Sequence, residues 1–148
     1  MLYVKVLSKL QFDTHTPDPE AIAIRIIDPQ GAKHSSISGY RDEIRLEFWD
    51  VENTIGKYAQ ISEQQAEQLY DFMLRHKDAE RLVVHCMAGI SRSNTVAQFF
   101  ASHIAKDDKM ASLVASAQGK LINYGVWDAL KEQAIKHNNW HMPFTGKE

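Results

Sequence analysis

The stretch that decides the fold reads Arg81-Leu82-Val83-Val84-His85-Cys86-Met87-Ala88-Gly89-Ile90-Ser91-Arg92-Ser93. Residues 81–85 form a compact apolar run that predicts a buried strand. Residues 95–101 are mostly apolar and predict the body of a buried helix. A strand, a glycine-containing loop and a helix in this order are typical of a domain that packs helices on a sheet.

Further elements are predicted on both sides of this stretch. Residues 1–9, 21–27 and 44–48 have the patterns of strands, and a turn follows the second of these at Asp28-Pro29-Gln30-Gly31. Residues 62–73, 108–118 and 124–137 have helical patterns, the first opened by a capping box of Ser62 and Gln65. We therefore expect an α/β fold, with a central mixed, mostly parallel sheet flanked by helices, in a single domain over residues 1–148.

Composition narrows the classes of function. The 148 residues carry a net charge of −2, so a broad basic surface for nucleic acid is not indicated. No apolar run approaches the roughly 20 residues of a membrane span, and residues 1–9 lack the long apolar centre of a signal peptide. A single cysteine excludes an internal disulfide, so we expect a reducing, cytoplasmic location. We also expect a monomer.

The loop after the predicted strand is suited to bind an oxyanion. If it curls tightly, the amides of Met87, Ala88, Gly89, Ile90, Ser91 and Arg92 can point inward, beside the positive end of the next helix. Gly89 allows a backbone conformation that a side chain would hinder. The planar fork of Arg92 can hold two phosphate oxygens.

The same loop would activate Cys86 as a nucleophile. A free cysteine thiol is only a few per cent ionised at pH 7, and a ring of amides with an arginine favours the thiolate. The Ser93 hydroxyl can donate to the sulfur and ease its departure from an intermediate. We interpret His85 as support for the loop through backbone hydrogen bonds, and not as a catalytic base.

The residues from His85 to Ser93 resemble the Cys-x5-Arg-Ser/Thr signature of the protein tyrosine phosphatase superfamily. Residues 82–84 and 88–93 are similar to dual-specificity phosphatases, and Phe48-Trp49-Asp50-Val51 resembles small tyrosine-phosphatase-like proteins of bacteria and phages. The resemblance covers residues 44–104. It implies attack by Cys86 on phosphorus, a phosphocysteine intermediate, and an aspartic acid that protonates the leaving oxygen and then activates water. It implies neither a metal nor a cofactor.

Asp50 is the candidate acid, because it follows a predicted strand upstream of Cys86. Trp49 directly precedes it, a departure from the Trp-Pro-Asp order of related enzymes. Asp42 is the reserve candidate, whereas Asp71 lies within a predicted helix and faces solvent. Asn123 resembles an asparagine found after the loop in the superfamily, but we interpret it first as the cap of the helix from residue 124.

Three functions are compatible with the loop. The leading hypothesis is a phosphomonoesterase that acts on phosphorylated protein, on phosphotyrosine and also on phosphoserine or phosphothreonine. Neutral side chains at 87, 88 and 90 disfavour phosphoinositides, whose phosphatases place lysines there. The alternative is a phosphate-binding module without turnover, against which the presence of Cys86 and Asp50 argues. The third function is that of a different cysteine enzyme, such as a sulfurtransferase or an arsenate reductase. Sulfurtransferase loops have a shorter cysteine-to-arginine spacing, and arsenate reductases usually recruit further cysteines, which this chain lacks.

Histidine spacing indicates no metal site. His137 and His141 are four residues apart, a spacing that metal sites use, but Asn138 and Asn139 weaken the helix between them. No third ligand is near in sequence, so we expect no metal there.

Overall fold

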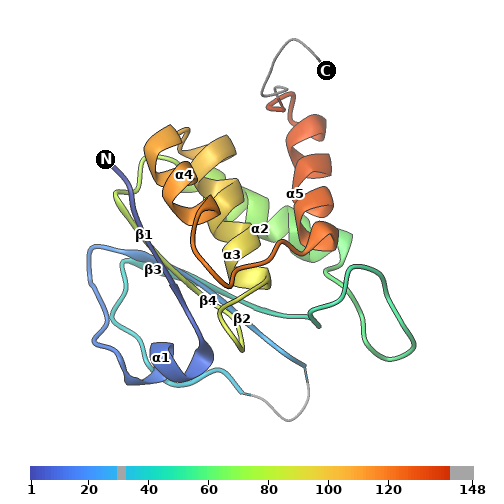
Figure 1. The fold of residues 1–148 in the computed structure, drawn as a ribbon, viewed down its shortest axis with the longest axis horizontal. Helices are drawn as coiled ribbons and strands as arrows, with labels where there is room; N and C mark the ends of the chain where they lie inside the picture. The colour runs from blue at the N-terminus through green and yellow to red at the C-terminus, as the bar shows by residue number, and fades with distance from the viewer. Residues whose placement is uncertain (30–32, 141–148) are drawn as a thin grey trace.

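Four parallel strands form the centre of the structure, a computed structural model that describes residues 1–29 and 33–140 (Figure 1). Their order in the sheet is β1-β4-β2-β3, and all three pairings between the described strands are parallel. The α/β class is thereby confirmed, and the sheet is parallel throughout these strands instead of mixed. The strands are β1 (Tyr3–Leu7), β2 (Ile22–Ile27), β3 (Asp42–Glu47) and β4 (Arg81–His85).

Helices cover both faces of the sheet, unequally. One face carries α2 to α5, and the short α1 lies on the other (Figure 1). The helices are α1 (Lys9–Thr14), α2 (Glu63–Arg75), α3 (Arg92–Phe99), α4 (Asp108–Ala115) and α5 (Tyr124–Lys136), with a π-helical turn η1 (Phe100–Ile104) that continues α3. No helix among the described residues is long and apolar enough to cross a lipid bilayer.

Strand β4 divides its side chains between these two layers. Leu82 and Val84 pack in the large core with α2, α3 and α5, whereas Val83 joins Phe12 of α1 in a small cluster on the other face. His85 also faces α1, since its ring centroid is 4.2 Å from that of Phe12. This alternation, expected for a strand, returns Cys86 to the large core.

Local capping explains where several helices begin. The predicted capping box is confirmed: the Ser62 hydroxyl accepts from the Gln65 amide at 3.0 Å, and Gln65 Oε1 accepts from the Ser62 amide at 3.0 Å. Ser8 and Gln11 form the same motif at the start of α1, a helix that our sequence analysis did not predict. Six residues are too few for a clear helical periodicity, so the capping box was its main signal.

The sheet brings four strand ends to one edge. Because all the strands run the same way, the residues after β1, β2, β3 and β4 gather there, and this is the edge where α/β proteins bind ligands. Ser8, Asp28, Phe48 and Cys86 are the first residues beyond these ends. Residues far apart in sequence therefore meet around Cys86.

Candidate active site

The thiol of Cys86 lies at the base of the loop between β4 and α3. Its side chain is buried, with Sγ 3.0 Å from the hydroxyl oxygen of Ser93 and 3.2 Å from the amide nitrogen of Gly89, which donates to it. The amide can only donate, whereas in the contact with Ser93 either the sulfur or the hydroxyl oxygen can supply the proton.

Gly89 is the point where the loop presses against the first strand. Its φ angle is +73°, in the left-handed region that favours glycine. A Cβ atom there would lie 2.7 Å from the backbone nitrogen of Ser8 and 2.8 Å from the carbonyl carbon of Leu7. The predicted need for glycine thus has two causes, backbone conformation and close approach to the β1–α1 junction.

The β1–α1 junction also fixes the start of the loop by hydrogen bonds. The Cys86 amide donates to the Leu7 carbonyl at 3.3 Å, and the Lys9 amide donates to the Met87 carbonyl at 3.1 Å. Within one peptide group the C=O and the next N–H point in opposite directions. Because the Met87 carbonyl faces α1, the Ala88 amide faces away from it, as an inward-facing cradle requires.

Side chains of the loop leave its outer surface neutral. Ala88 and Ile90 are exposed, Met87 and Ser91 are half-buried, and Gly89 is buried. Of the six residues predicted to bind through their backbone, 87–91 lie in the loop between β4 and α3, and Arg92 begins α3.

Arg92 begins α3 and is held by two neighbouring strand ends. Its side chain is 3% exposed. Nη1 donates to the Phe48 carbonyl after β3, and Nη2 lies 2.8 Å from Oδ1 of Asp28 after β2. Nε is buried and has no hydrogen-bond partner in the structure, so it remains available as a donor.

Asp28 is a site residue that the sequence analysis missed. The sequence pattern predicts only a turn that begins at Asp28 and Pro29, and residues 30 and 31 of that turn lie outside the described residues. The sequence does show a carboxylate directly after a buried strand. This carboxylate can be assigned to the site only when the sheet order is known, because that order places β2 beside β4.

Asp50 follows the end of β3 and is tethered by Asn123. The side chain of Asp50 is exposed, and its Oδ1 accepts from Nδ2 of Asn123 at 2.8 Å. Asn123 Oδ1 accepts from the Val126 amide at 3.1 Å, which confirms the predicted helix cap. The buried Asn123 backbone amide donates to the Thr95 hydroxyl of α3 at 2.8 Å. One asparagine therefore joins the start of α5, the candidate acid and the helix after the loop.

The reserve acid, Asp42, lies on the wrong side of the sheet. It begins β3, whereas Cys86 follows the end of a parallel strand, so the two are at opposite edges. Its carboxylate is 2.8 Å from Nε2 of His76, which lowers the pKa of Asp42. Asp71 is exposed on α2, as expected.

His85 has the properties of a structural support. Burial lowers its pKa to about 4, so the ring is neutral at pH 7. Its Nδ1 lies 3.3 Å from the Cys86 carbonyl, which can only accept, so Nδ1 carries the proton. The nearby positive charge of Arg25 lowers the pKa of His85 further.

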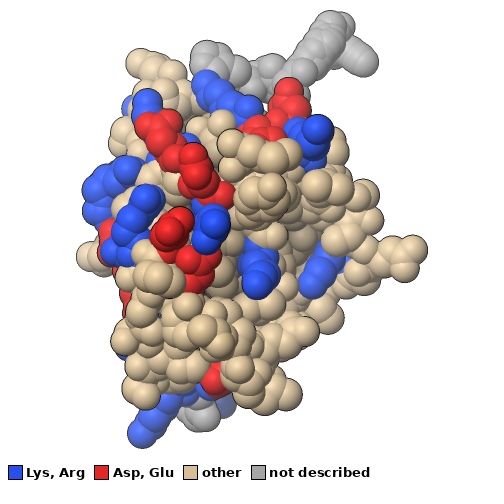
Figure 2. All heavy atoms as spheres, turned by 90° about the vertical axis from the view of Figure 1, so that its left-hand side faces the viewer, with Lys and Arg blue, Asp and Glu red and all other residues tan. Residues whose placement is uncertain are grey.

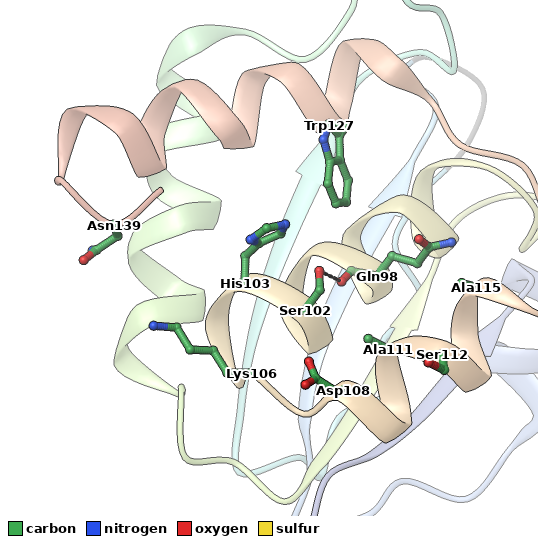
Figure 3. Close-up of a pocket in the computed structure, with 10 residues that line it drawn as sticks. All are labelled: Gln98, Ser102, His103, Lys106, Asp108, Ala111, Ser112, Ala115, Trp127 and Asn139. Carbon is green, nitrogen blue, oxygen red and sulfur yellow. Dashed lines mark hydrogen bonds between the residues drawn. The ribbon is translucent and has the colours of Figure 1, made fainter. Parts of the chain in front are cut away.

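A hollow lies on the helical side of the molecule, away from the loop. It has a volume of about 800 Å³ and is lined by residues of α3, η1, α4 and α5, among them His103 and Trp127 (Figure 3). None of its lining residues belongs to loop 86–92 or to the Asp50 segment. It therefore contributes nothing to the site around Cys86.

Neither the charges on one face nor the grouping of metal-ligating side chains among the described residues indicates a second site. On the face shown in Figure 2, lysines and arginines alternate with acidic residues instead of forming one basic patch. In the described part of the chain, no three His, Cys, Asp or Glu side chains are grouped as a metal site would need. His137 Nε2 is 4.0 Å from Asp71, and His141 lies outside the described residues.

Comparison with solved structures shows that the chain has the fold of the dual-specificity phosphatases. Human DUSP28 matches with a TM-score of 0.57 and 16% identity, over 91% of this chain and 93% of that one. PTPMT1 in complex with PI(5)P matches with a TM-score of 0.52 and 15% identity, over 79% and 78%. A putative mouse dual specificity phosphatase complexed with zinc tungstate matches with a TM-score of 0.51 and 19% identity, over 78% and 70%.

Sequence comparisons found no counterpart. No protein-family profile matches the chain, and no curated protein matches it. At identities of 15–19% the structural matches establish a shared fold. Activity has to be argued from the residues around Cys86.

Proposed function

We propose that this chain hydrolyses phosphomonoesters of proteins, phosphotyrosine first, through a phosphocysteine on Cys86. The observation that carries the proposal is the environment of the Cys86 sulfur. The sulfur accepts a hydrogen bond from the Gly89 amide at 3.2 Å and lies 3.0 Å from the Ser93 hydroxyl. Donation from both groups would stabilise a thiolate, and Arg92, whose Nε has no partner among the described residues, stands at the end of the same turn to bind phosphoryl oxygens.

In the first step, the Cys86 thiolate attacks phosphorus and an S–P bond forms. The bond from phosphorus to the leaving oxygen breaks, and Asp50 supplies the proton that this oxygen needs. The loop amides and Arg92 hold the three equatorial oxygens, whose charge is spread in the transition state. Asn123, bonded to Asp50 Oδ1 at 2.8 Å, leaves Oδ2 to carry the proton.

In the second step, water attacks the phosphocysteine. Asp50, now ionised, accepts a proton from that water, the S–P bond breaks and inorganic phosphate leaves. The sulfur departs as a thiolate, which the Ser93 hydroxyl stabilises by donating to it. Since only reduced Cys86 can react, we propose a reducing compartment such as the cytoplasm.

The neutral side chains of residues 87–91 support a protein substrate over a polyanionic headgroup. Ala88 and Ile90, the exposed side chains of the loop, carry no charge that would meet additional phosphates. PTPMT1, one of the structural neighbours, was solved with a phosphoinositide, so the two substrate classes have to be compared directly.

The test is a turnover assay of the wild type and Cys86→Ser with p-nitrophenyl phosphate, phosphopeptides and phosphoinositides. We expect the wild type to turn over substrate without a metal and to be inhibited by vanadate. We expect no turnover by Cys86→Ser. Equal turnover by both proteins would exclude the mechanism. Binding of phosphate without turnover in the wild type would instead indicate the phosphate-binding module.

Asp50→Ala tests the assignment of the acid. Loss of a general acid costs about 10²- to 10⁴-fold in rate, and most where the leaving group is a poor one. We therefore expect a large loss with phosphotyrosine peptide and a smaller loss with p-nitrophenyl phosphate. An unchanged rate with the peptide would show that Asp50 is not the acid.

A further inference from the structure

Two consecutive residues, Lys120 and Leu121, lie across the outside of the loop that follows β4. The Lys120 ammonium group donates to the Gly89 carbonyl, and the Leu121 amide donates to the Ile90 carbonyl at 2.9 Å. The Leu121 carbonyl in turn accepts from Nδ2 of Asn94 on α3 at 3.0 Å. This pair, which we call the outer strap, is thereby fixed to both the loop and the helix.

The outer strap determines which way two peptide groups of the loop face. A carbonyl and the following N–H point in opposite directions. Because the carbonyls of Gly89 and Ile90 are turned to the strap, the amides of Ile90 and Ser91 are turned away from it. A carbonyl that accepts a hydrogen bond also makes the N–H of its own peptide group a stronger donor. The strap therefore both orients and strengthens these two donors.

The charge of Lys120 has a second consequence. Arg92 is paired with Asp28, whose carboxylate offsets its charge at 2.8 Å. Lys120 is half-buried, where a charge is less screened than at the surface, and its ammonium group touches the loop itself. Lys120 therefore adds positive charge beside the loop, where an oxyanion and a thiolate have to be stabilised.

We propose that Lys120 is a positioning residue of the oxyanion site, which keeps the Gly89 carbonyl turned outward and the Ile90 and Ser91 amides turned toward bound oxygens. The inference rests on the proposed function, because these amide directions matter only if an oxyanion binds in the loop. Nothing in the order of residues 108–124 indicated this role, since Lys120 lies in an irregular segment between α4 and α5.

The experiment measures tungstate binding by calorimetry, p-nitrophenyl phosphate turnover and urea unfolding for three variants and the wild type. Lys120→Met keeps the aliphatic stem but removes the donor and its charge, and Lys120→Arg restores both. Lys109→Met, at an exposed position of α4, is the matched control. We expect Lys120→Met to bind tungstate about tenfold more weakly, with a similar loss in kcat/KM, because a hydrogen bond from a charged donor is lost.

The outcomes separate this inference from the proposed function. Lys120→Arg should recover most of the tungstate affinity, and Lys109→Met should bind tungstate as the wild type does. The urea unfolding midpoints of all three variants should equal that of the wild type. Equal tungstate affinity in Lys120→Met and the wild type would overturn the role of Lys120 and leave the phosphatase proposal intact. A fall in stability that parallels the fall in affinity, unrelieved in Lys120→Arg, would also overturn it. If the wild type binds tungstate but does not turn over p-nitrophenyl phosphate, only the phosphatase proposal is overturned. If it neither binds tungstate nor turns over substrate, the phosphatase proposal and the role of Lys120 are both overturned.

Discussion

Gly89→Ala is the substitution whose effect follows most directly from the geometry of the loop. The alanine methyl group would lie 2.7 Å from the Ser8 nitrogen and 2.8 Å from the Leu7 carbonyl carbon, which are backbone atoms. They cannot rotate away as a side chain could. The loop and the β1–α1 junction would have to separate, and the hydrogen bonds that join them would lengthen.

The cost has two parts. A side chain at a φ of +73° costs about 1 kcal/mol, because the left-handed conformation crowds Cβ. Separation weakens the bonds from Cys86 N to Leu7 O and from Lys9 N to Met87 O, each of which contributes about 1 kcal/mol. We expect Gly89→Ala to lower the free energy of unfolding by about 3 kcal/mol in total.

Gly119→Ala provides the control for the first part alone. Gly119 has a φ of +75°, and a Cβ atom there would meet no atom within 4 Å. Urea unfolding of both variants should therefore give a loss of about 1 kcal/mol for Gly119→Ala and about 3 kcal/mol for Gly89→Ala. Equal losses would refute the close approach of loop and strand. Turnover of p-nitrophenyl phosphate should fall strongly in Gly89→Ala, because the amides around Cys86 move.

Three further predictions concern residues around the loop. Asp28→Asn should destabilise the fold by about 2 kcal/mol in urea unfolding, because it leaves the buried Arg92 without its counter-charge. Asp18→Asn, in a pair exposed to solvent, should cost much less, and equal losses would contradict this. The pKa of His85 is about 4 in the folded protein against 6.5 unfolded, so the free energy of unfolding should fall as pH drops through this window, by about 3 kcal/mol at pH 4. In urea unfolding, His85→Asn should show a flatter dependence of stability on pH. An unchanged dependence would contradict the burial of His85 as the cause of the pH effect. Asn123→Asp keeps an oxygen to cap α5 but replaces the donor to Asp50 by a like charge, so steady-state kinetics should show slower turnover of poor leaving groups. Equal rates would contradict the tether.

The strand, the loop and its helix could be predicted because their signals are local. A β-branched run, a glycine and a hydroxyl after Arg92 lie within thirteen consecutive residues. The capping box of α2 and the Asn123 cap of α5 are likewise set by residues three positions apart. Such features depend on backbone geometry over a single turn, which sequence spacing determines.

Asp28 and Lys120 could not be predicted because their roles depend on which strands and segments become neighbours. The sheet order β1-β4-β2-β3 places strands side by side that are distant in sequence, and this brings Asp28 to Arg92. Asp42 was a reasonable reserve acid on spacing alone. The parallel direction of β3 then put it at the opposite edge, while Asp50 came to the same edge as Cys86.

The measurement that tests the central claim most directly is the location of phosphate on the protein during turnover. The wild type and Cys86→Ser are mixed with p-nitrophenyl phosphate, quenched rapidly and digested, and the phosphorylated peptide is identified by mass spectrometry. The expected result is a phosphate on the sulfur of Cys86 in the wild type and none on the corresponding peptide of Cys86→Ser. Turnover that leaves Cys86 unmodified, or phosphate on another residue, would contradict a thiolate mechanism.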